Sequence, residues 1–223
     1  MSHQTVSEIG HNFNSDLFKA VDLIHASKDC GCDYVKFQLY DTDKIKSPGD
    51  TNYSELKKAQ LSYNDMWFLY ETAKKAEIGF ICSVFDVERL NWYMETDPIV
   101  HKIASRSIFD EELIREMKLT QVPIIASLGA WDKPDFPKLK ADFLFCLSRR
   151  DILQNGVTNF PEKFDKYAGF SDHTIGIEWA KKAIDRGARI IEKHFTIDHN
   201  LRGWDQCASA TYKEMKEIVD YGK

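Results

Sequence analysis

The sequence lacks the features that mark secreted and membrane proteins. No stretch reaches about 18 consecutive apolar residues, and the opening MSHQTVSEIG has no basic patch followed by an apolar run. The cysteines at positions 30, 32, 82, 146 and 207 are odd in number and form no C-x-x-C pair. We therefore expect a cytoplasmic protein with reduced thiols and no contact with a membrane.

An excess of basic residues is also missing. The chain has 30 Lys and Arg against 35 Asp and Glu, which gives a formal net charge of -5. This balance provides no sequence-wide attraction to nucleic acid. Internal repeats, low-complexity tracts and linkers are not visible either. With 223 residues, of which 43% are hydrophobic, the chain can build one sizeable core, and we expect one domain over residues 1–223.

Strand-like runs alternate with helical patterns along the chain. We expect strands at Val6–Ile9, Tyr34–Phe37, Phe80–Ser83, Ile99–Ile103, Val122–Ala126, Phe143–Leu147, Ala168–Ser171 and Ile190–Phe195. We expect helices at Asp16–Asp29, Tyr63–Lys75, Val87–Glu95, Asp110–Lys118 and Ile177–Arg186. Eight strands in this arrangement predict an α/β fold, a compact (β/α)8 TIM barrel of one domain.

Two connections depart from the regular alternation. A long polar loop is expected between Phe37 and Tyr63. The segment between Ser127 and Ala141 contains Gly129, Pro134 and Pro137, which disfavour a helix. We expect this segment to replace the fifth helix, which helps to explain a chain shorter than the roughly 250 residues typical of the fold.

Two histidines stand at equivalent positions after the last two predicted strands. His173 follows the strand at Ala168–Ser171, and His194 lies near the end of the next strand. Parallel strands joined by one helix bring both imidazoles to the same edge, close enough to bind one metal ion. Asp205 lies in the following loop. A single histidine at the end of a strand is more often a buried or surface imidazole with hydrogen-bond partners than a metal ligand. Two histidines at equivalent strand ends favour metal binding.

Polar side chains follow the other predicted strands as well. In a barrel these positions face the substrate. They are Glu8, Lys36, Gln38, Ser83, Phe85, Asp86, Lys102, Ser105, Ser127, Ser148, Arg149 and Arg150. Several cations and hydroxyls at one mouth suit a small, multiply anionic substrate such as a phosphorylated carboxylic acid. Any single Lys or Arg could instead be a solvated charge at the rim, although Lys36 and Lys102 have apolar strand neighbours.

Long motifs in this chain resemble the sialic acid synthase family in order and spacing. They are SEIGHNFNSD, DYVKFQ, the S-x-F-D of residues 83–86, HKIAS, FSDHTIG and IIEKHFT. The resemblance covers nearly the whole chain. It implies a barrel that condenses phosphoenolpyruvate with an aldose, usually an N-acetylated hexosamine, to give a nonulosonic acid and phosphate.

The resemblance also implies roles for individual residues. The positions matching His173 and His194 hold a divalent metal, commonly Mn2+. The positions matching Lys36, Ser83, Lys102, Ser105, Ser127, Ser148 and Ser171 form the phosphoenolpyruvate cradle. The positions matching Glu8, Gln38, Glu192 and Asp205 face the sugar, the water or the metal.

Several positions depart from the family pattern. The first loop reads Asn12-Phe13-Asn14-Ser15 in place of Asn-His-Asn-Gly, and GWDQ at 203–206 replaces Gly-Pro-Asp-His. Arg149 and Arg150 replace a small residue and a Tyr, and resemble the arginine-bearing loop of related heptulosonate-phosphate synthases. Because the chain stops at Lys223, we expect no C-terminal antifreeze-like domain, whose arginine reaches the sugar in the family.

Two functions follow from these observations. The first is a metal-dependent synthase that joins phosphoenolpyruvate to an aldose, phosphorylated or lacking an N-acetyl group, and that we expect to be a homo-oligomer. The second is a non-catalytic barrel that binds sugars or anions as the partner of a complete synthase. The enzyme is favoured by the presence together of Glu8, Lys36, Lys102, His173, His194 and Asp205.

Overall fold

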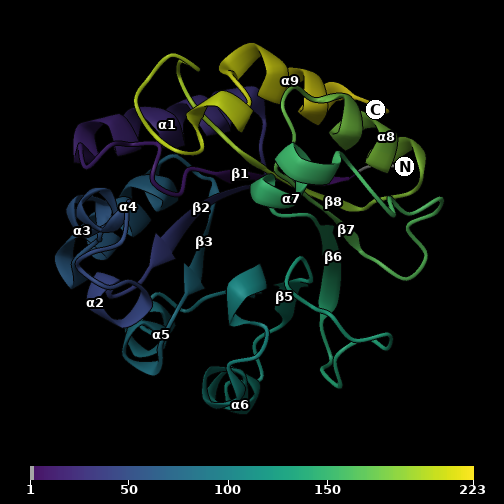
Figure 1. Cartoon of the computed structure of the whole chain (residues 1–223). Helices are drawn as coiled ribbons and strands as arrows, with labels where there is room; N and C mark the ends of the chain where they lie inside the picture. The colour runs from purple at the N-terminus through teal and green to yellow at the C-terminus, as the bar shows by residue number, and fades with distance from the viewer. Residues whose placement is uncertain (1–2) are drawn as a thin grey trace.

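Eight parallel strands close into a barrel in the computed structural model, which describes residues 3–223 except the side chains of residues 149 and 150. The strands are β1 (Gln4–Glu8), β2 (Tyr34–Leu39), β3 (Gly79–Val84), β4 (His101–Ile103), β5 (Ile124–Ser127), β6 (Asp142–Cys146), β7 (Gly169–Asp172) and β8 (Ile190–His194). Each strand pairs with the next, and β8 pairs with β1 (Figure 1). The predicted (β/α)8 TIM barrel is confirmed.

Helices surround the barrel. They are α1 (Leu17–Cys30), α4 (Tyr63–Lys75), α5 (Val87–Met94), α6 (Glu111–Leu119), α8 (Glu178–Asp185) and α9 (Tyr212–Asp220). Local sequence sets their ends. At the start of α1 the Asp16 carboxylate accepts hydrogen bonds from two backbone N–H groups, and Gly31 with φ of 85° ends that helix. Among the described residues, no helix is long and apolar enough to cross a membrane.

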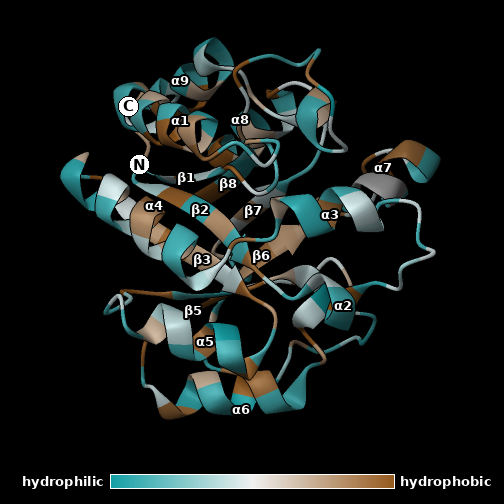
Figure 2. Ribbon diagram, turned by 90° about the vertical axis from the view of Figure 1, so that its left-hand side faces the viewer, coloured by the Kyte–Doolittle hydropathy of each residue, from teal (hydrophilic) through white to brown (hydrophobic). Residues whose placement is uncertain are grey.

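The connections differ in part from expectation. The segment 128–141 contains no helix, as predicted. The expected polar loop before Tyr63 instead contains two short helices, α2 (Thr42–Ile45) and α3 (Tyr53–Ala59). A further helix that was not predicted, α7 (Arg149–Asn155), follows β6. Figure 2 shows α2, α3 and α7 at the same end of the molecule.

The inner face of the barrel has two layers because side chains alternate along each strand. Near the amino ends the inward side chains form an apolar cluster of Val6, Ile81, Val100, Ile125, Leu144, Ala168 and Ile190. Two residues further along the same strands stand Glu8, Ser83, Lys102, Ser127, Cys146 and Glu192. The apolar layer therefore closes the barrel beneath a polar one.

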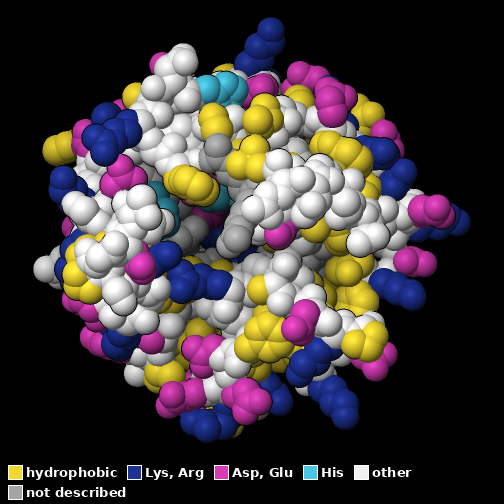
Figure 3. All heavy atoms as spheres, viewed as in Figure 1, with side chains coloured by type: hydrophobic (Ala, Val, Ile, Leu, Met, Phe, Trp, Pro, Cys, Tyr) yellow, Lys and Arg dark blue, Asp and Glu magenta, His cyan; other side chains and the backbone are white. Residues whose placement is uncertain are grey.

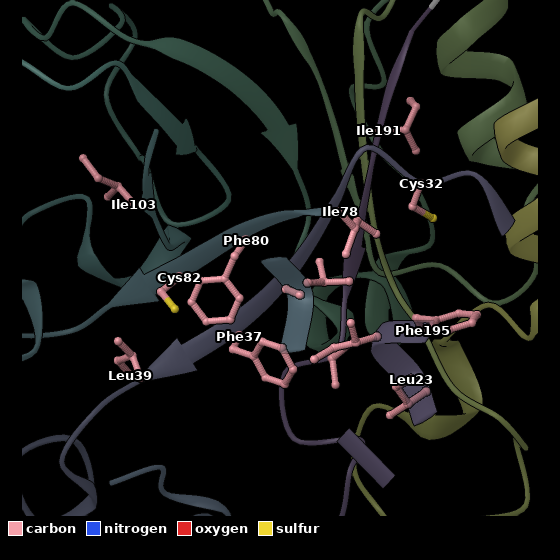
Figure 4. Packing of buried hydrophobic residues seen from close by; sticks show 14 of the residues in the cluster. Leu23, Cys32, Phe37, Leu39, Ile78, Phe80, Cys82, Ile103, Ile191 and Phe195 are labelled. Atoms are coloured by element: carbon pink, nitrogen blue, oxygen red, sulfur yellow. The ribbon is translucent and has the colours of Figure 1, made fainter. Parts of the chain in front are cut away.

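The outer face of the strands carries the main core. Figure 4 shows Phe37 of β2 beside Phe80 of β3, and Leu23 of α1 near Phe195. The rings of Phe37 and Phe80 have centroids 5.8 Å apart, and Ile191 of β8 is fully buried. Burial of such side chains stabilises the fold by about 1.5–3 kcal/mol each.

Gly169 is required by the close approach of β7 and β8. A Cβ atom at this position would lie 1.9 Å from the carbonyl oxygen of Ile190. Any side chain would push the two strands apart. Since these strands deliver His173 and His194, the glycine helps to fix the spacing of the two imidazoles.

The outward-facing His101 of β4 is fully buried and predicts a pH-dependent stability. Its Nε2 lies 2.8 Å from Thr120 Oγ1, and its Nδ1 has no hydrogen-bond partner among the described residues. Burial lowers the pKa of His101 from 6.5 to about 4. Between these two values the unfolded chain binds a proton at this site that the folded chain does not, so stability falls as the pH falls.

We expect His101 to lower the free energy of unfolding by about 3 kcal/mol as the pH falls from 6.5 to 4. Urea unfolding of His101→Gln across this range should show a pH dependence flatter than the wild type by that amount. The matched control is His25→Gln on the exposed side of α1. An unchanged pH slope in His101→Gln would contradict the assignment.

Candidate active site

A cavity of about 720 Å³ opens at the carboxyl end of the barrel. Figure 3 shows the hollow near the centre of this face, with histidine side chains in cyan at its wall. Predicted site residues from all parts of the chain line it together. They are Glu8, Lys36, Gln38, Ser83, Phe85, Lys102, Ser105, Ser127, Ser171, His173, Glu192, His194 and Asp205.

Among the predicted residues after β6, Ser148 does not line this cavity. The Ser148 hydroxyl instead caps α7, where it accepts from the Asp151 N–H at 3.1 Å and donates to the Asp151 carboxylate at 2.5 Å. The side chains of Arg149 and Arg150 lie outside the described part of the structure.

Two lysines and two glutamates form a buried ionic cluster at the floor of the cavity. This Lys–Glu cluster consists of Glu8, Lys36, Lys102 and Glu192. The Lys36 ammonium pairs with Glu8 and lies 3.7 Å from Glu192 Oε1. The Lys102 ammonium lies 3.6 Å from the same Glu192 oxygen. All four side chains are at most 8% exposed, and the charges balance.

Serine hydroxyls and an amide complete the cluster. Lys36 Nζ donates to Ser83 Oγ at 3.1 Å, and Lys102 Nζ donates to Ser127 Oγ at 2.8 Å. Ser171 Oγ donates to Glu192 at 3.0 Å. Gln38 Nε2 donates to Glu8 at 2.7 Å. These neutral groups satisfy part of the hydrogen-bonding capacity of the charged side chains.

Burial and neighbouring charge act in opposite directions on these groups. Burial alone would lower the pKa of Lys36, but Glu192 and Glu8 outweigh it and raise that pKa. Burial lowers the pKa of Lys102, which Glu192 offsets only in part. Burial alone would raise the pKa of Glu192, yet Lys102 and Lys36 hold it below its usual range. Glu192 is therefore an ionised carboxylate shared by two cations.

His173 and His194 meet at the cavity wall, as the sequence predicts. Their ring centroids lie 5.4 Å apart. His173 Nδ1 lies 3.3 Å from the carbonyl oxygen of Ser171, which can only accept, so Nε2 keeps its lone pair. Burial, with His194 next, lowers the pKa of His173 to about 4, and the ring is a neutral imidazole.

The histidine pair fits a metal as a two-ligand site. His194 Nδ1 is buried and has no hydrogen-bond partner among the described residues. Neutral imidazoles are the usual nitrogen ligands of Mn2+ and Zn2+. In the described part of the chain, no group of three or more His, Cys, Asp or Glu is spaced to hold a metal. The remaining coordination positions would therefore belong to substrate or water.

A second ion pair lies behind the histidines, on the outer face of the strands. Lys193 and Asp172 are fully buried and 3.1 Å apart. Lys193 also donates to the Thr174 carbonyl at 2.9 Å, and Asp172 accepts from the Thr174 N–H at 2.8 Å. Each partner adjoins one histidine in sequence. The pair therefore ties together the ends of β7 and β8.

The structure adds cavity residues that the sequence analysis missed. His11 has a buried Nε2 without a hydrogen-bond partner among the described residues, and burial lowers the pKa of this ring. Arg106 donates to the carbonyl of Ile45 at 3.3 Å and lies over the Phe85 ring at 5.8 Å. The position of His11 three residues after Glu8 was an available signal. Arg106 follows Ser105 directly.

Loops form the outer wall of the cavity. Asp205 belongs to the segment after β8, which Gln206 anchors by donating to the Asn12 carbonyl at 3.2 Å. Arg202 of the same segment pairs with Glu55 of α3 at 3.0 Å. The mouth is thus bordered by two segments that contact each other.

Comparison with known proteins gives one consistent result. The sequence matches the NeuB family over residues 23–138 and 147–223. It is 31% identical to N,N'-diacetyllegionaminic acid synthase of Legionella pneumophila, over 96% of this chain and 69% of that protein. It is 29% identical to pseudaminic acid synthase of Campylobacter jejuni, over 96% of this chain and 71% of that protein.

A solved structure agrees with these sequence matches. The crystal structure of N-acetylneuraminic acid synthetase from Leptospira borgpetersenii, in complex with citrate, superposes with a TM-score of 0.86 at 28% identity. The match covers 98% of this chain and 82% of that one. The similarity therefore extends to the whole barrel.

The Lys193–Asp172 pair predicts a large effect of a single substitution. Lys193→Met leaves the Asp172 charge buried without its ammonium, so we expect the free energy of unfolding to fall by about 3–5 kcal/mol. Chemical denaturation measures this loss. Lys216→Met, which breaks an exposed pair with Asp220, should change the free energy of unfolding little. The double variant Asp172→Asn/Lys193→Met should lose less than Lys193→Met; equal losses would contradict the pairing.

Proposed function

The chain belongs to the NeuB family, and we propose that it condenses phosphoenolpyruvate with an aldose to give a 2-keto-3-deoxy sugar acid and phosphate. One observation carries this proposal: two buried lysines with serine hydroxyls lie in one cavity with the His173–His194 pair. The relatives are named as synthases of legionaminic, pseudaminic and N-acetylneuraminic acids, which supports a nonulosonate-like product.

The reaction forms one carbon–carbon bond, and at the carbon that bears the phosphate ester it forms one carbon–oxygen bond to water and breaks the one to phosphate. The methylene carbon of the enol attacks the aldehyde carbon, and the aldehyde oxygen takes up a proton. Positive charge then develops on the carbon that bears the phosphate ester. Water adds to this carbon and loses a proton. The tetrahedral intermediate then expels phosphate as its new hydroxyl gives up the second proton and becomes the ketone carbonyl.

Residues of the Lys–Glu cluster suit the charges of this reaction. Lys36 and Lys102 can bind the phosphate and carboxylate of phosphoenolpyruvate, assisted by Ser83 and Ser127. Their burial at 4% and 3% side-chain exposure strengthens these contacts relative to water. Glu8 can orient the sugar or the attacking water through its carboxylate.

A divalent metal, Mn2+ in our proposal, would be held by His173 and His194. When bound, it supplies a Lewis acid that polarises the aldehyde carbonyl. The hydrogen bond of His173 Nδ1 to the Ser171 carbonyl fixes the ring and its tautomer. Asp205 lines the cavity with these histidines and can orient the sugar hydroxyls.

A phosphate-release assay tests the proposed function. The protein is incubated with Mn2+, phosphoenolpyruvate and a panel of aldoses that includes phosphorylated and N-acetylated forms. We expect phosphate release that requires both substrates, with a product of matching mass. If none of the aldoses in the panel supports phosphate release, the alternative of a non-catalytic barrel is favoured. If phosphorylated aldoses react best, Arg149→Ala and Arg150→Ala determine whether either arginine causes the preference.

Loss of either floor lysine should weaken binding of phosphoenolpyruvate. We expect Lys36→Met and Lys102→Met each to reduce its binding free energy by about 1.5–3 kcal/mol, the scale of a hydrogen bond to a charged group. Titration calorimetry measures the change. The control Lys58→Met removes an exposed cation from the rim of the same cavity and should change affinity little. Wild-type affinity in both floor variants would refute the assignment.

Loss of both histidines should abolish stoichiometric metal binding. We expect His173→Ala/His194→Ala to retain its far-ultraviolet circular dichroism but to lose Mn2+ after dialysis, because both proposed protein ligands are gone. Elemental analysis provides the measurement. His199→Ala, whose ring contacts Glu214 and the Ser209 carbonyl, serves as the control and should retain the metal. An unchanged metal content of the double variant would refute the site.

A further inference from the structure

The floor lysines already have anionic partners before any substrate binds. Glu192 Oε1 lies between the two ammonium groups, 3.7 Å from Lys36 and 3.6 Å from Lys102. Lys36 also forms an ion pair with Glu8. Because two positive charges face two negative charges, the Lys–Glu cluster is neutral as it stands.

This balance opposes the binding of a further anion. A phosphate that approaches Lys36 or Lys102 also approaches the Glu192 carboxylate, which the same ammonium groups hold. Repulsion between like charges is stronger at a buried site than in water. Burial of uncompensated negative charge is also unfavourable. The cluster therefore disfavours anion binding unless negative charge is removed or positive charge is added.

The strand register places a source of positive charge next to Glu192. Glu192 precedes His194 by two residues on β8, so both side chains face the barrel interior. Its register partner on β7 is Ser171, which donates to the Glu192 carboxylate and precedes His173 by two residues. A cation on the histidine pair would thus lie beside the end of the cluster that carries Glu192.

We propose that Glu192 is an internal counter-anion, which occupies Lys36 and Lys102 in the metal-free protein and makes binding of a phosphate-bearing ligand depend on a cation at the His173–His194 pair. In this role Glu192 couples the two ligands: the site binds the anion weakly unless the metal is also bound. The identity of the ligand as phosphoenolpyruvate rests on the proposed function. The electrostatic coupling rests on the cluster alone.

The first test measures inorganic phosphate binding to metal-free protein. Calorimetry in the presence of a chelator compares the wild type with Glu192→Gln, which keeps the shape and removes the charge. We expect phosphate to bind about tenfold or more tightly to the variant. If Glu192 were instead a ligand-binding group, the same substitution would weaken binding. Equal or weaker affinity of Glu192→Gln therefore overturns the proposal.

Asp205→Asn provides the matched control. It removes the same unit charge from the wall of the same cavity, but leaves the contacts of both lysines with Glu192 unchanged. Phosphate affinity should change less than about threefold in this variant. An equal gain in both variants would mean that net charge alone is responsible, and would overturn the assignment to Glu192.

The second test measures the coupling itself, with phosphoenolpyruvate as the probe and with Mn2+ present or absent. In the wild type we expect Mn2+ to tighten phosphoenolpyruvate binding by about tenfold or more, and phosphoenolpyruvate to tighten Mn2+ binding equally. Glu192→Gln should lose most of this coupling. If that variant does not fold, Glu192→Ala replaces it. Absence of coupling in the wild type overturns the proposal.

These outcomes are separable from the fate of the proposed function. Tighter phosphate binding by Glu192→Gln together with no condensation would retain the counter-anion and refute the synthase. Condensation by the wild type, together with unchanged phosphate affinity in Glu192→Gln, would retain the synthase and refute the counter-anion.

Discussion

The closure of eight parallel strands into a barrel is the constraint on which the rest of the structure depends. An inward side chain in a closed barrel can reach solvent only at the two ends, and strand alternation brings every second residue to the interior. The apolar layer that includes Val6, Ile81 and Ile190 fills the amino end. The polar layer above it must satisfy its own charges, which explains why Lys36 and Lys102 have carboxylate partners.

The Lys193–Asp172 pair and the Lys–Glu cluster differ in how completely the protein encloses them. Lys193 and Asp172 contact each other and the backbone of Thr174, and both side chains are fully buried. The Lys–Glu cluster instead borders a cavity. Buried ion pairs rarely stabilise a fold more than apolar side chains of similar volume would. A charged cluster at a cavity floor is therefore better explained by binding than by stability.

The sequence predicts the barrel well because each strand is a short apolar run. It also predicts much of the site, because the fold places the residues that follow each strand at the mouth of the barrel. The sequence does not predict the segments whose structure depends on tertiary contacts. Helices as short as α2 and α7 are not stable on local propensity, so their sequences resemble loops. Ser148 shows the ambiguity of a strand-end serine, because the pattern Ser148-x-x-Asp151 is also a helix cap. His11 was missed because loop geometry, not periodicity, brings it to the cavity.

Strands and loops contribute to the site in different ways. The floor is rigid, since its side chains project from paired strands whose register fixes Glu8 opposite both Lys36 and His194. The wall consists of the α2–α3 segment and the segment after β8, joined by the Arg202–Glu55 pair between exposed side chains. An exposed pair contributes little to stability and can rearrange at low cost. The reaction centre is therefore fixed by the barrel, while the wall is the part that can adapt to the shape of the sugar.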